Sequence, residues 1–375
     1  MANRYHRFDE YYLVSESDME NVEYDERSKQ CCSRRCKMIL ILIFVVVLVL
    51  SFLFVFVVIP LVFMNSISLQ RLLIFTRFNL PSKTKYFEEY KFPAFKNEYV
   101  TVQDYDSGTN KSLGVWHILP VEEGIKALND SKFDYNLSLA TSNYSVLIYF
   151  HGTGEVRSFS ERKYQLLSFY FHVIAFDYRG YGDSSSGYLS EKTIVNDCVQ
   201  LYGWIRNRTQ SPIYIWGHSL GSAVAAETVA TLKKKDESPS GLILESAFTS
   251  LEEELYVHPY GKIFAWLPWF KATILEPLHK NGFIFDTATN IGHITCPIMI
   301  LHAEDDNEVP CKFGKKLYAI ASERMKNGKY IPTIYHEFDS NLSYGHFFIY
   351  QDPFLKYYIM DFLTLAKNQS TYWWH

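Results

Sequence analysis

The chain has 375 residues, 48% of them hydrophobic, with 37 basic and 41 acidic side chains and a net charge of −4. This length allows a sizeable core, and the mildly acidic balance gives no basic, aromatic-interleaved surface of the kind that binds nucleic acid. The six cysteines form neither a dense disulfide framework nor a Cys/His cluster with metal-site spacing. We therefore expect no nucleic-acid partner, no metal and no organic cofactor.

The N-terminal part of the chain predicts a tail followed by a membrane anchor. Residues 8–26 contain eight acidic and no basic side chains, which predicts a disordered, solvated tail over residues 1–37. Met38–Met64 is a Leu/Ile/Val/Phe run interrupted only by Ser51 and Pro60. As a helix it would be ~40 Å long, enough for the ~30 Å hydrocarbon core of a bilayer. A cleaved signal peptide has a shorter apolar region nearer the start, so we predict an uncleaved signal-anchor.

Charges and glycosylation acceptors favour one orientation of this anchor. Five basic residues closely precede the apolar run and two closely follow it: Arg27, Lys29, Arg34, Arg35 and Lys37 before it, Arg71 and Arg77 after it. By the positive-inside rule the tail is cytoplasmic and the rest of the chain is exoplasmic. Asn-x-Ser/Thr acceptors occur only after the run, in agreement with a lumenal, glycosylated domain. They are Asn110, Asn129, Asn136, Asn143, Asn207, Asn341 and Asn368.

The cysteines divide at the anchor. Cys31, Cys32 and Cys36 abut its cytoplasmic end, where reversible palmitoylation and unmodified thiols are both open to this sequence. The other three follow the anchor. Because three is an odd number, at least one of them is unpaired within the monomer.

Apolar, strand-like runs alternate with helical stretches after the anchor. Val100–Val102 and Trp116–Leu119 predict antiparallel leading strands, and Val121–Asn143 predicts a polar loop inserted before the next strand. Six further apolar runs predict buried strands of a mostly parallel sheet with helices on both faces, an α/β fold. These runs are Val146–Phe150, Val173–Asp177, Ile213–Trp216, Leu242–Glu245, Ile298–Ala303 and Thr333–Phe338.

The segment Ile213–Ser222 reads Ile-Tyr-Ile-Trp-Gly-His-Ser-Leu-Gly-Ser, which places Gly-x-Ser-x-Gly between a strand pattern and a helix pattern. Gly217 and Gly221 flank Ser219 because a sharp strand-to-helix turn leaves no room for side chains. The helix that follows aims its N-terminal amides at the reacting centre. In this context the motif predicts a nucleophile elbow with Ser219 as the nucleophile, in preference to a structural turn serine.

A nucleophilic serine needs a base and an acid that orients the base, and in this fold they follow in the order Ser, Asp, His. The polar loop after the fifth parallel run offers Asp306, in an Asp-x-x-Val-Pro frame, as the acid; Asp305 is the alternative. His346, in Tyr-Gly-His after the last strand, is the predicted base. His302 and His336 lie inside strands, so we expect them to be packed.

The first parallel run leads directly into His-Gly-Thr-Gly. A glycine-containing turn after an early strand usually supplies one backbone donor for the oxyanion, and the residue after the nucleophile supplies the other. We predict Leu220 and Thr153 as the two donors, with a neighbouring amide of the same loop as the alternative to Thr153. His151 is expected to organise this loop.

The glycine-punctuated loop after Asp177 lacks the Lys-Ser/Thr of a phosphate-binding loop. We therefore expect Arg179 and Asp183 to fix this loop and not to bind substrate. Further on, Tyr256–Phe285 is an aromatic-rich insertion that includes Trp266, Trp269 and Phe270. Its place between two strands predicts a cap whose aromatics suit an acyl pocket and a membrane interface, with plain core packing as the alternative.

Residues 173–353 resemble the α/β-hydrolase domain-containing protein twelve family, which are membrane-anchored lysophosphatidylserine and monoacylglycerol lipases. The resemblance rests on five segments of this chain. They are Phe176–Ser184 (FDYRGYGDS), Ile215–Gly221 (IWGHSLG), Leu244–Thr249 (LESAFT), Leu301–Asp306 (LHAEDD) and Tyr344–His346 (YGH).

This resemblance implies an α/β-hydrolase fold, a triad of Ser219, Asp306 and His346, a single N-terminal span, and a lumenal domain in the endoplasmic reticulum. Family members commonly carry His-Gly-Asn-Ala-Gly where this chain has His-Gly-Thr-Gly at 151–154. The donor amide and the head-group preference therefore stay open. The expected activity is hydrolysis of acyl esters of single-chain membrane lipids through an acyl-enzyme. A thioesterase or acyltransferase, and a non-catalytic binding module, are the alternatives.

The predicted parts of the chain follow from these motifs. They are the tail at residues 1–37, the anchor at 38–64, a juxtamembrane connector at 65–96, a catalytic domain at 97–366 with its cap at about 250–290, and a C-terminal tail at 367–375.

Overall fold

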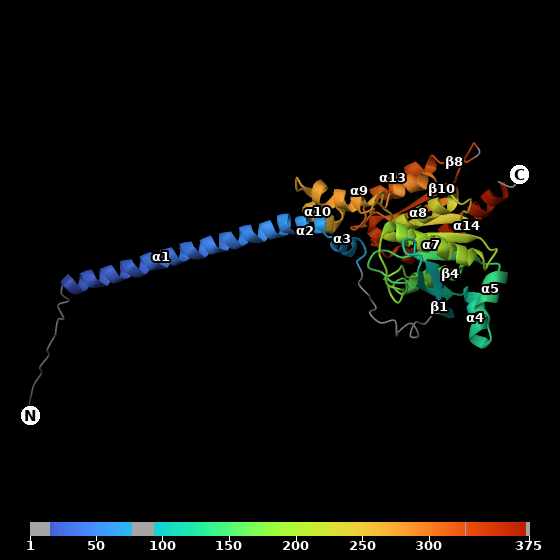
Figure 1. Ribbon diagram of the computed structural model, residues 1–375, viewed down its shortest axis with the longest axis horizontal. Helices are drawn as coiled ribbons and strands as arrows, with labels where there is room; N and C mark the ends of the chain where they lie inside the picture. Colours follow the sequence, from blue (N-terminus) through green and yellow to red (C-terminus); the bar gives the residue numbers. More distant parts are fainter. Residues whose placement is uncertain (1–15, 77–93, 327, 373–375) are drawn as a thin grey trace, which may run out of the picture. The chain divides into compact units, whose positions relative to one another are not determined.

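The computed structural model describes residues 16–76, 94–326 and 328–372. The chain divides into two compact units, Met1–Leu61 and Val62–His375 (Figure 1). Within its described residues, the first unit consists of the long helix α1 (Glu16–Leu53), the π-helical turn η1 (Phe54–Val58) and the start of α2 (Ile59–Asn65). Pro60 has no backbone N–H and its ring crowds the carbonyl four residues earlier, which accounts for the wider turn before it.

This N-terminal helix is long enough to anchor the protein in a membrane. Residues Arg34–Asn65 form the one candidate span among the described residues. The helix begins at Glu16, so the prediction of a disordered tail is wrong for residues 16–37. That segment contains no glycine or proline, and the adjoining apolar helix spares it the cost of nucleation. Residues 8–15 of the acidic tail lie outside the described residues.

The second unit is built on an eight-stranded sheet in the order β1-β2-β4-β3-β5-β6-β7-β10. β1 and β2 are antiparallel, β2 is antiparallel to β4, and all other neighbours are parallel. This confirms the predicted fold class. The strands are β1 (Phe95–Gln103), β2 (Asn110–Ile118), β3 (Ser145–Phe150), β4 (Phe171–Phe176), β5 (Ile213–His218), β6 (Gly241–Glu245), β7 (Ile298–Ala303) and β10 (Thr333–Phe338), with a separate hairpin of β8 (Met325–Lys326) and β9 (Lys329–Tyr330).

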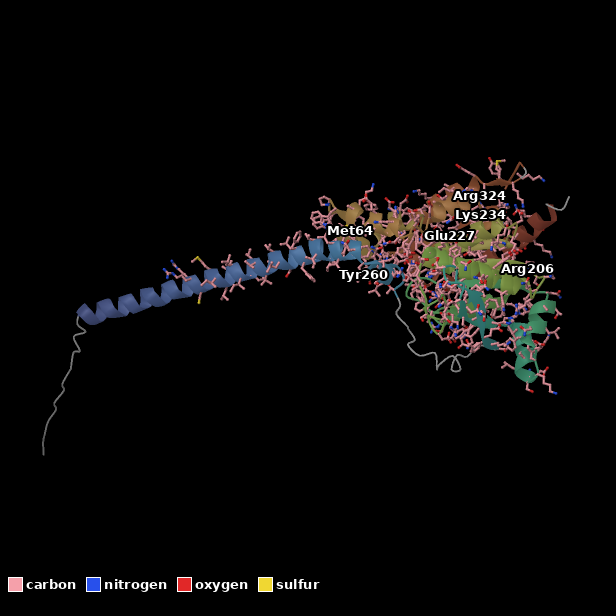
Figure 2. The ribbon with its side chains drawn as sticks, in the orientation of Figure 1. Met64, Arg206, Glu227, Lys234, Tyr260 and Arg324 are labelled. Atoms are coloured by element: carbon pink, nitrogen blue, oxygen red, sulfur yellow. The ribbon has the colours of Figure 1, made fainter. Side chains whose placement is uncertain are left out.

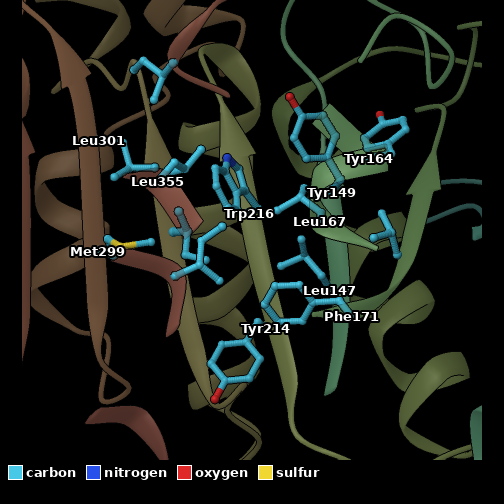
Figure 3. Close-up of a cluster of buried hydrophobic side chains, with 14 of the residues drawn as sticks. Leu147, Tyr149, Tyr164, Leu167, Phe171, Tyr214, Trp216, Met299, Leu301 and Leu355 are labelled. Atoms are coloured by element: carbon cyan, nitrogen blue, oxygen red, sulfur yellow. The ribbon is translucent and has the colours of Figure 1, made fainter. Parts of the chain in front are cut away.

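Helices cover both faces of this sheet because its strands are apolar on both sides. On one face α6 (Glu161–Leu167) and α14 (Leu355–Tyr372) enclose a cluster that includes Tyr214 and Trp216 of β5 (Figure 3). On the other face α8 packs on β5, α7 on α8, and α13 on β7 and β10. The bounds of these three are α7 (Glu191–Arg206), α8 (Leu220–Lys233) and α13 (Lys312–Ser322), and two short 3₁₀ helices are η4 (Ser340–Leu342) and η5 (Ile349–Gln351).

The polar insertion before β3 is helical, which corrects the prediction of a loop. It forms α4 (Val121–Asn129) and α5 (Tyr135–Thr141). Asp134 caps α5 by accepting hydrogen bonds from two backbone amides of its first turn. Glu123 of α4 accepts hydrogen bonds from Ser138 and Ser142, which ties the two helices together.

Two predicted boundaries also differ from the structure. Helix α3 (Ile67–Ile74) lies in the predicted connector, yet it packs within the catalytic unit: Gln70 Oε1 accepts a hydrogen bond from Asn281 Nδ2 at 2.6 Å, and Phe75 meets the ring of Phe283. The C-terminal tail is helical up to Tyr372, because α14 continues into it without a breaking residue.

The cap is a string of short helices between β6 and β7. Glu191 of α7 holds its far end by accepting hydrogen bonds from the amides of Ile284 and Phe285 at 2.7 and 2.8 Å. Of its aromatics, Tyr260, which is labelled in Figure 2, and Trp266 are exposed by 67% and 60% of their surface. Phe270 is 2% exposed and packs on Tyr256. Phe270 is thus core of the cap and not part of its outer surface. The elements are α9 (Leu251–Val257), α10 (Pro259–Ala265), the π turn η3 (Lys271–Leu275), α11 (Glu276–Lys280) and α12 (Thr287–Gly292).

Candidate active site

Ser219 stands at the turn between β5 and α8 with a strained backbone, φ 53° and ψ −122°. A non-glycine residue holds such dihedrals only where its surroundings impose them. Both flanking glycines are required: a Cβ on Gly217 would come within 2.4 Å of the Gly221 carbonyl oxygen, and one on Gly221 within 2.2 Å of the Phe150 carbonyl oxygen. The geometry is that of a nucleophile elbow.

Asp306 and His346, 40 residues apart in the chain, meet where the loops after β7 and β10 adjoin. Asp306 Oδ2 lies 2.8 Å from His346 Nδ1. Asp306 Oδ1 accepts hydrogen bonds from the amides of Glu308 and Val309 at 3.0 and 2.8 Å. Burial alone would raise the pKa of Asp306, but the hydrogen bonds and charges of His302 and His346 outweigh it and hold that pKa well below its usual range. The acid therefore stays ionised beside the imidazole.

The neighbouring acid, Asp305, has a different partner. Its Oδ1 accepts a hydrogen bond from the backbone amide of Gly345 at 3.0 Å. The structure thus brings Asp306 to the imidazole and Asp305 to the backbone of the same loop. His302 is buried in β7, where its Nε2 donates to the Val309 carbonyl at 2.8 Å, and His336 stacks on Tyr358. Both histidines are packed, as predicted.

A second layer of polar residues, which the sequence analysis missed, holds the loop of His346. His218 Nε2 donates to the His346 carbonyl oxygen at 2.9 Å, and His218 Nδ1 lies 2.7 Å from Glu155 Oε1. Burial raises the pKa of Glu155, but the charge and hydrogen bond of His218 outweigh it and lower that pKa to about 2. Burial also opposes the charged form of His218, but the charge and hydrogen bond of Glu155 outweigh the effect of burial and raise the pKa of His218. The signals for this pair were a histidine inside the elbow and an acid directly after His-Gly-Thr-Gly.

The loop after β3 reaches the serine. A Cβ on Gly152 would lie 3.2 Å from the Cβ of Ser219. Thr153 and Leu220 line the same cavity as Ser219, which is where oxyanion donors would be needed; their role as donors stays a prediction. The hydroxyl of Thr153 donates to the carbonyl oxygen of Ile74, at the end of α3, at 2.7 Å.

This cavity has a volume of about 360 Å³, within the range of small-molecule sites. Its walls are mainly apolar and come from α3, the loop after β3, the elbow, the cap and the catalytic loops. Polar side chains from the cap and from the Asp306 loop also reach it. Its described lining residues are Leu73, Ile74, Thr76, Thr153, Gly154, Glu155, Phe159, Ser219, Leu220, Phe248, Leu251, Glu254, Leu255, His258, Tyr260, Glu308, Val309 and Phe347.

The loop after β4 is fixed by ion pairs, as predicted. Arg179 donates to Asp197 through two bonds of 2.6 Å and also bonds Asp104. Asp183 accepts hydrogen bonds from the guanidinium of Arg157 and from the hydroxyl of Tyr99. His151 has its Nδ1 2.8 Å from the Gly152 carbonyl oxygen of its own loop, and its ring packs on Tyr178 and Tyr181 of the loop after β4. None of these contacts places Arg179 or Asp183 at the serine.

The predicted modification sites are at the surface wherever their side chains are described. All seven asparagines of the glycosylation motifs are exposed. Cys36 is exposed, and Cys31 and Cys32 lie on α1. Within the described part of the chain, no group of three or more His, Cys, Asp or Glu residues could hold a metal ion.

The elbow after β5, the acid after β7 and the histidine after β10 define the class of this protein as an α/β-hydrolase of the serine hydrolase type. Residues 141–281 match the family model described as serine aminopeptidase, S33. An esterase of Pyrococcus furiosus has the same fold, with a TM-score of 0.51 at 18% identity over 72% of this chain and 91% of its own.

Curated relatives narrow this class to a family. The chain is 38% identical over 313 residues to "Lysophosphatidylserine lipase ABHD12" of Danio rerio, covering 81% of this chain and 80% of the relative. It is 36% identical to the protein of that name in Mus musculus (83% and 78% covered) and 32% identical to "Protein ABHD12B" of Homo sapiens (74% of each). The chain belongs to the ABHD12 family, and it is a hydrolytic enzyme.

Proposed function

We propose that this enzyme hydrolyses the acyl ester of single-chain glycerolipids, lysophosphatidylserine first and monoacylglycerol next, at a membrane surface. The observation that carries the chemistry is the 2.8 Å contact between Asp306 and His346 in the unit that also holds the strained Ser219 elbow. The mainly apolar cavity at Ser219 suits an acyl chain. The head group is inferred from the activity in the names of the relatives.

The reaction follows from these positions. Because Asp306 accepts the Nδ1–H of His346, the Nε2 of that ring keeps a lone pair. It takes the proton of Ser219 as the hydroxyl oxygen attacks the acyl carbonyl, while the amides of Leu220 and Thr153 stabilise the oxyanion. His346 then returns the proton to the leaving alcohol. Water, activated by the same histidine, releases the fatty acid from the serine.

Two surfaces support a substrate drawn from a bilayer. Tyr260, Ile263 and Trp266 on the cap are exposed, and so is Leu72 on α3, which begins two residues after the apolar span. Extraction of a lipid costs about 0.8 kcal/mol for each methylene that leaves the bilayer, so one chain is far easier to extract than two. This favours lysophospholipids and monoacylglycerols over two-chain phospholipids.

The direct test is turnover by purified full-length enzyme in vesicles. Ser219→Ala should lose hydrolysis of lysophosphatidylserine by ~10⁴-fold or more and should no longer react with a fluorophosphonate probe. Wild-type enzyme should prefer lysophosphatidylserine to monoacylglycerol and both to diacylphosphatidylserine. Wild-type turnover by Ser219→Ala would refute the mechanism, and preference for the two-chain lipid would refute the substrate class.

We further propose that the protein is a single-pass protein of the endoplasmic reticulum membrane, with its N-terminus cytoplasmic and its catalytic unit lumenal. The basic residues before the span and the exposed acceptor asparagines after it support this orientation. Endoglycosidase should increase gel mobility, and protease added to sealed microsomes should trim only residues before the span. Digestion of the catalytic unit in sealed vesicles would reverse the orientation.

The cytoplasmic cysteines Cys31, Cys32 and Cys36 are proposed palmitoylation sites, because they stand next to the membrane end of the helix. Hydroxylamine-sensitive acyl exchange on wild-type protein should be lost when all three are replaced by serine. An unchanged signal in the triple variant would exclude them.

A further inference from the structure

Glu254, in cap helix α9, is a buried carboxyl that the reaction does not use. Only 4% of the residue is exposed. Both of its carboxyl oxygens are buried, and neither has a hydrogen-bond partner among the described residues. The side chain lines the cavity that also holds Ser219. Because buried polar groups are almost always hydrogen-bonded in native proteins, this carboxyl is left for a ligand to satisfy.

The surroundings of Glu254 keep it uncharged. Burial, followed by the negative charges of Asp306 and Glu308, raises the pKa of Glu254 to about 8, against the opposing charge of Lys312. At neutral pH the group is therefore mostly a carboxylic acid. It then offers one O–H donor and one carbonyl acceptor.

We propose that Glu254 is a specificity-determining residue that binds the free hydroxyl on the glycerol carbon next to the scissile ester. This inference rests on the proposed function for the substrate class. An alcohol hydroxyl is itself both donor and acceptor, so it satisfies a neutral carboxyl at both oxygens without bringing a charge into an apolar cavity.

The other polar groups of a lysophospholipid suit this position less well. A phosphate or carboxylate would face the negative charges of Asp306 and Glu308, and no lysine or arginine is among the described residues that line the cavity. An ammonium group would require the ionised form of Glu254, which burial opposes. A hydroxyl can bind the neutral form of Glu254 directly, without a change in the charge of either group.

The consequence is selection between one and two acyl chains. In a lysophospholipid or a monoacylglycerol the oxygen next to the ester is a hydroxyl, whereas in a two-chain lipid it is acylated and has no hydrogen to donate. A two-chain lipid would therefore bury Glu254 without a partner. Sites built to bond a hydroxyl discriminate strongly against substrates that lack it, because the polar group of the site is then left unpaired.

The experiment compares matched esters on full-length enzyme. The soluble pair is 2-hydroxypropyl butyrate and propyl butyrate; the vesicle pair is 1-oleoyl lysophosphatidylserine and its 2-deoxy analogue. Wild-type kcat/KM should favour the hydroxyl member of each pair by about 10- to 100-fold. Glu254→Leu should reduce both ratios to near one. Glu254→Gln, whose amide still donates and accepts, should keep them, as should the control Glu253→Gln on the exposed face of the same helix.

Other outcomes would overturn the inference. A wild-type ratio in Glu254→Leu would show that the carboxyl does not bind the hydroxyl, and an equal loss on all four esters would show a structural role. If Glu254→Leu instead abolished a preference for lysophosphatidylserine over its N-acetyl derivative, the site would bind ammonium. A wild-type enzyme that turns over the soluble pair but no lipid would refute the proposed substrates, while the soluble ratio would still decide the role of Glu254.

Discussion

Asp306, in the loop after β7, and Glu254, in the cap, are both buried carboxyls, yet their surroundings move their pKa values in opposite directions. Asp306 accepts hydrogen bonds from two backbone amides and from His346, and its pKa is held well below the usual range. Glu254 has no such donor among the described residues, and its pKa rises to about 8. The loops that we propose to carry catalysis thus already hold Asp306 and His346 in contact, whereas the cap leaves a neutral acid for the substrate to satisfy.

The largest expected effect comes from replacing Asp306, the carboxyl that stays ionised beside His346. Asp306→Asn should lower kcat by ~10⁴-fold, because an amide can force the wrong tautomer on His346 and cannot stabilise its charged form. Asp305→Asn is the matched control: its partner is a backbone amide, and we expect a loss of less than ~10-fold. Steady-state rates on a soluble ester measure both. Similar losses in the two variants would contradict the assignment of Asp306, and not Asp305, as the acid.

The second prediction concerns the layer behind His346. Glu155→Gln removes the charge that holds His218 protonated and bonded to the His346 carbonyl, so the imidazole should lose its fixed position. We expect kcat to fall by ~10- to 100-fold with KM for a soluble ester nearly unchanged, since a small misplacement of a catalytic group is costly. Glu237→Gln, at an exposed position, is the control. A change in KM alone would place Glu155 in substrate binding.

The third prediction tests the outer surface of the cap. Tyr260→Ser combined with Trp266→Ser should raise KM for vesicle-bound lipid by ~10-fold and leave a soluble ester unaffected. Tenfold corresponds to about 1.4 kcal/mol, less than the about 1.5–3 kcal/mol of one fully buried side chain, because both rings enter the membrane interface only in part. Tyr330→Ser removes an aromatic that is 69% exposed but lies in β9, outside the cap, and should have no effect. Equal changes on both substrates would show that these side chains serve packing.

The smallest effect is on stability as a function of pH. The pKa of Glu254 is raised from 4.5 to about 8, so the folded state resists its ionisation and stability falls as pH rises through that interval. The Tm of wild-type enzyme should therefore decrease from pH 5 to pH 9, and Glu254→Gln should lessen the decrease by ~4–8 °C. Part of the decrease in Tm should remain in Glu254→Gln, because burial and Glu227 raise the pKa of Glu191 to about 9 and its ionisation also destabilises the folded state. Glu253→Gln should leave the slope unchanged.

The sequence predicted the turn at Ser219 and the meeting of Asp306 with His346 far better than it predicted the cap. The elbow could be predicted from local sequence, because the sharp turn at Ser219 requires a glycine on each side and both glycines stand in the motif. Asp306 and His346 follow from chain order, since the carboxyl ends of parallel strands meet at one edge of the sheet. The six parallel strands were predictable for a similar reason, as continuous apolar runs.

The buried polar residues of the cap and of the layer behind His346 could not be predicted from local sequence or chain order. Glu252, Glu253 and Glu254 read as one solvated acidic turn, and only the docking of α9 decides that the third points inward. Glu155 and His218 are 63 residues apart, and although each stands next to a motif, only the fold shows that they meet. The helices α4 and α5 were missed because polar composition resembles a loop when the capping of Asp134 is not recognised.

The hydrogen bond from Thr153 to the carbonyl of Ile74 joins the loop after β3 to the end of α3, the short helix that follows the apolar span. Leu73 and Ile74 form part of the cavity wall, and they stand within ten residues of the end of the apolar span at Asn65. A fragment cut at β1 would lose Leu73 and Ile74 from the wall of the cavity at Ser219, and Thr153 would lose its hydrogen bond to Ile74. The shortest fragment that keeps both contacts with some margin therefore begins at residue 62, where the second unit starts, and not at the first strand.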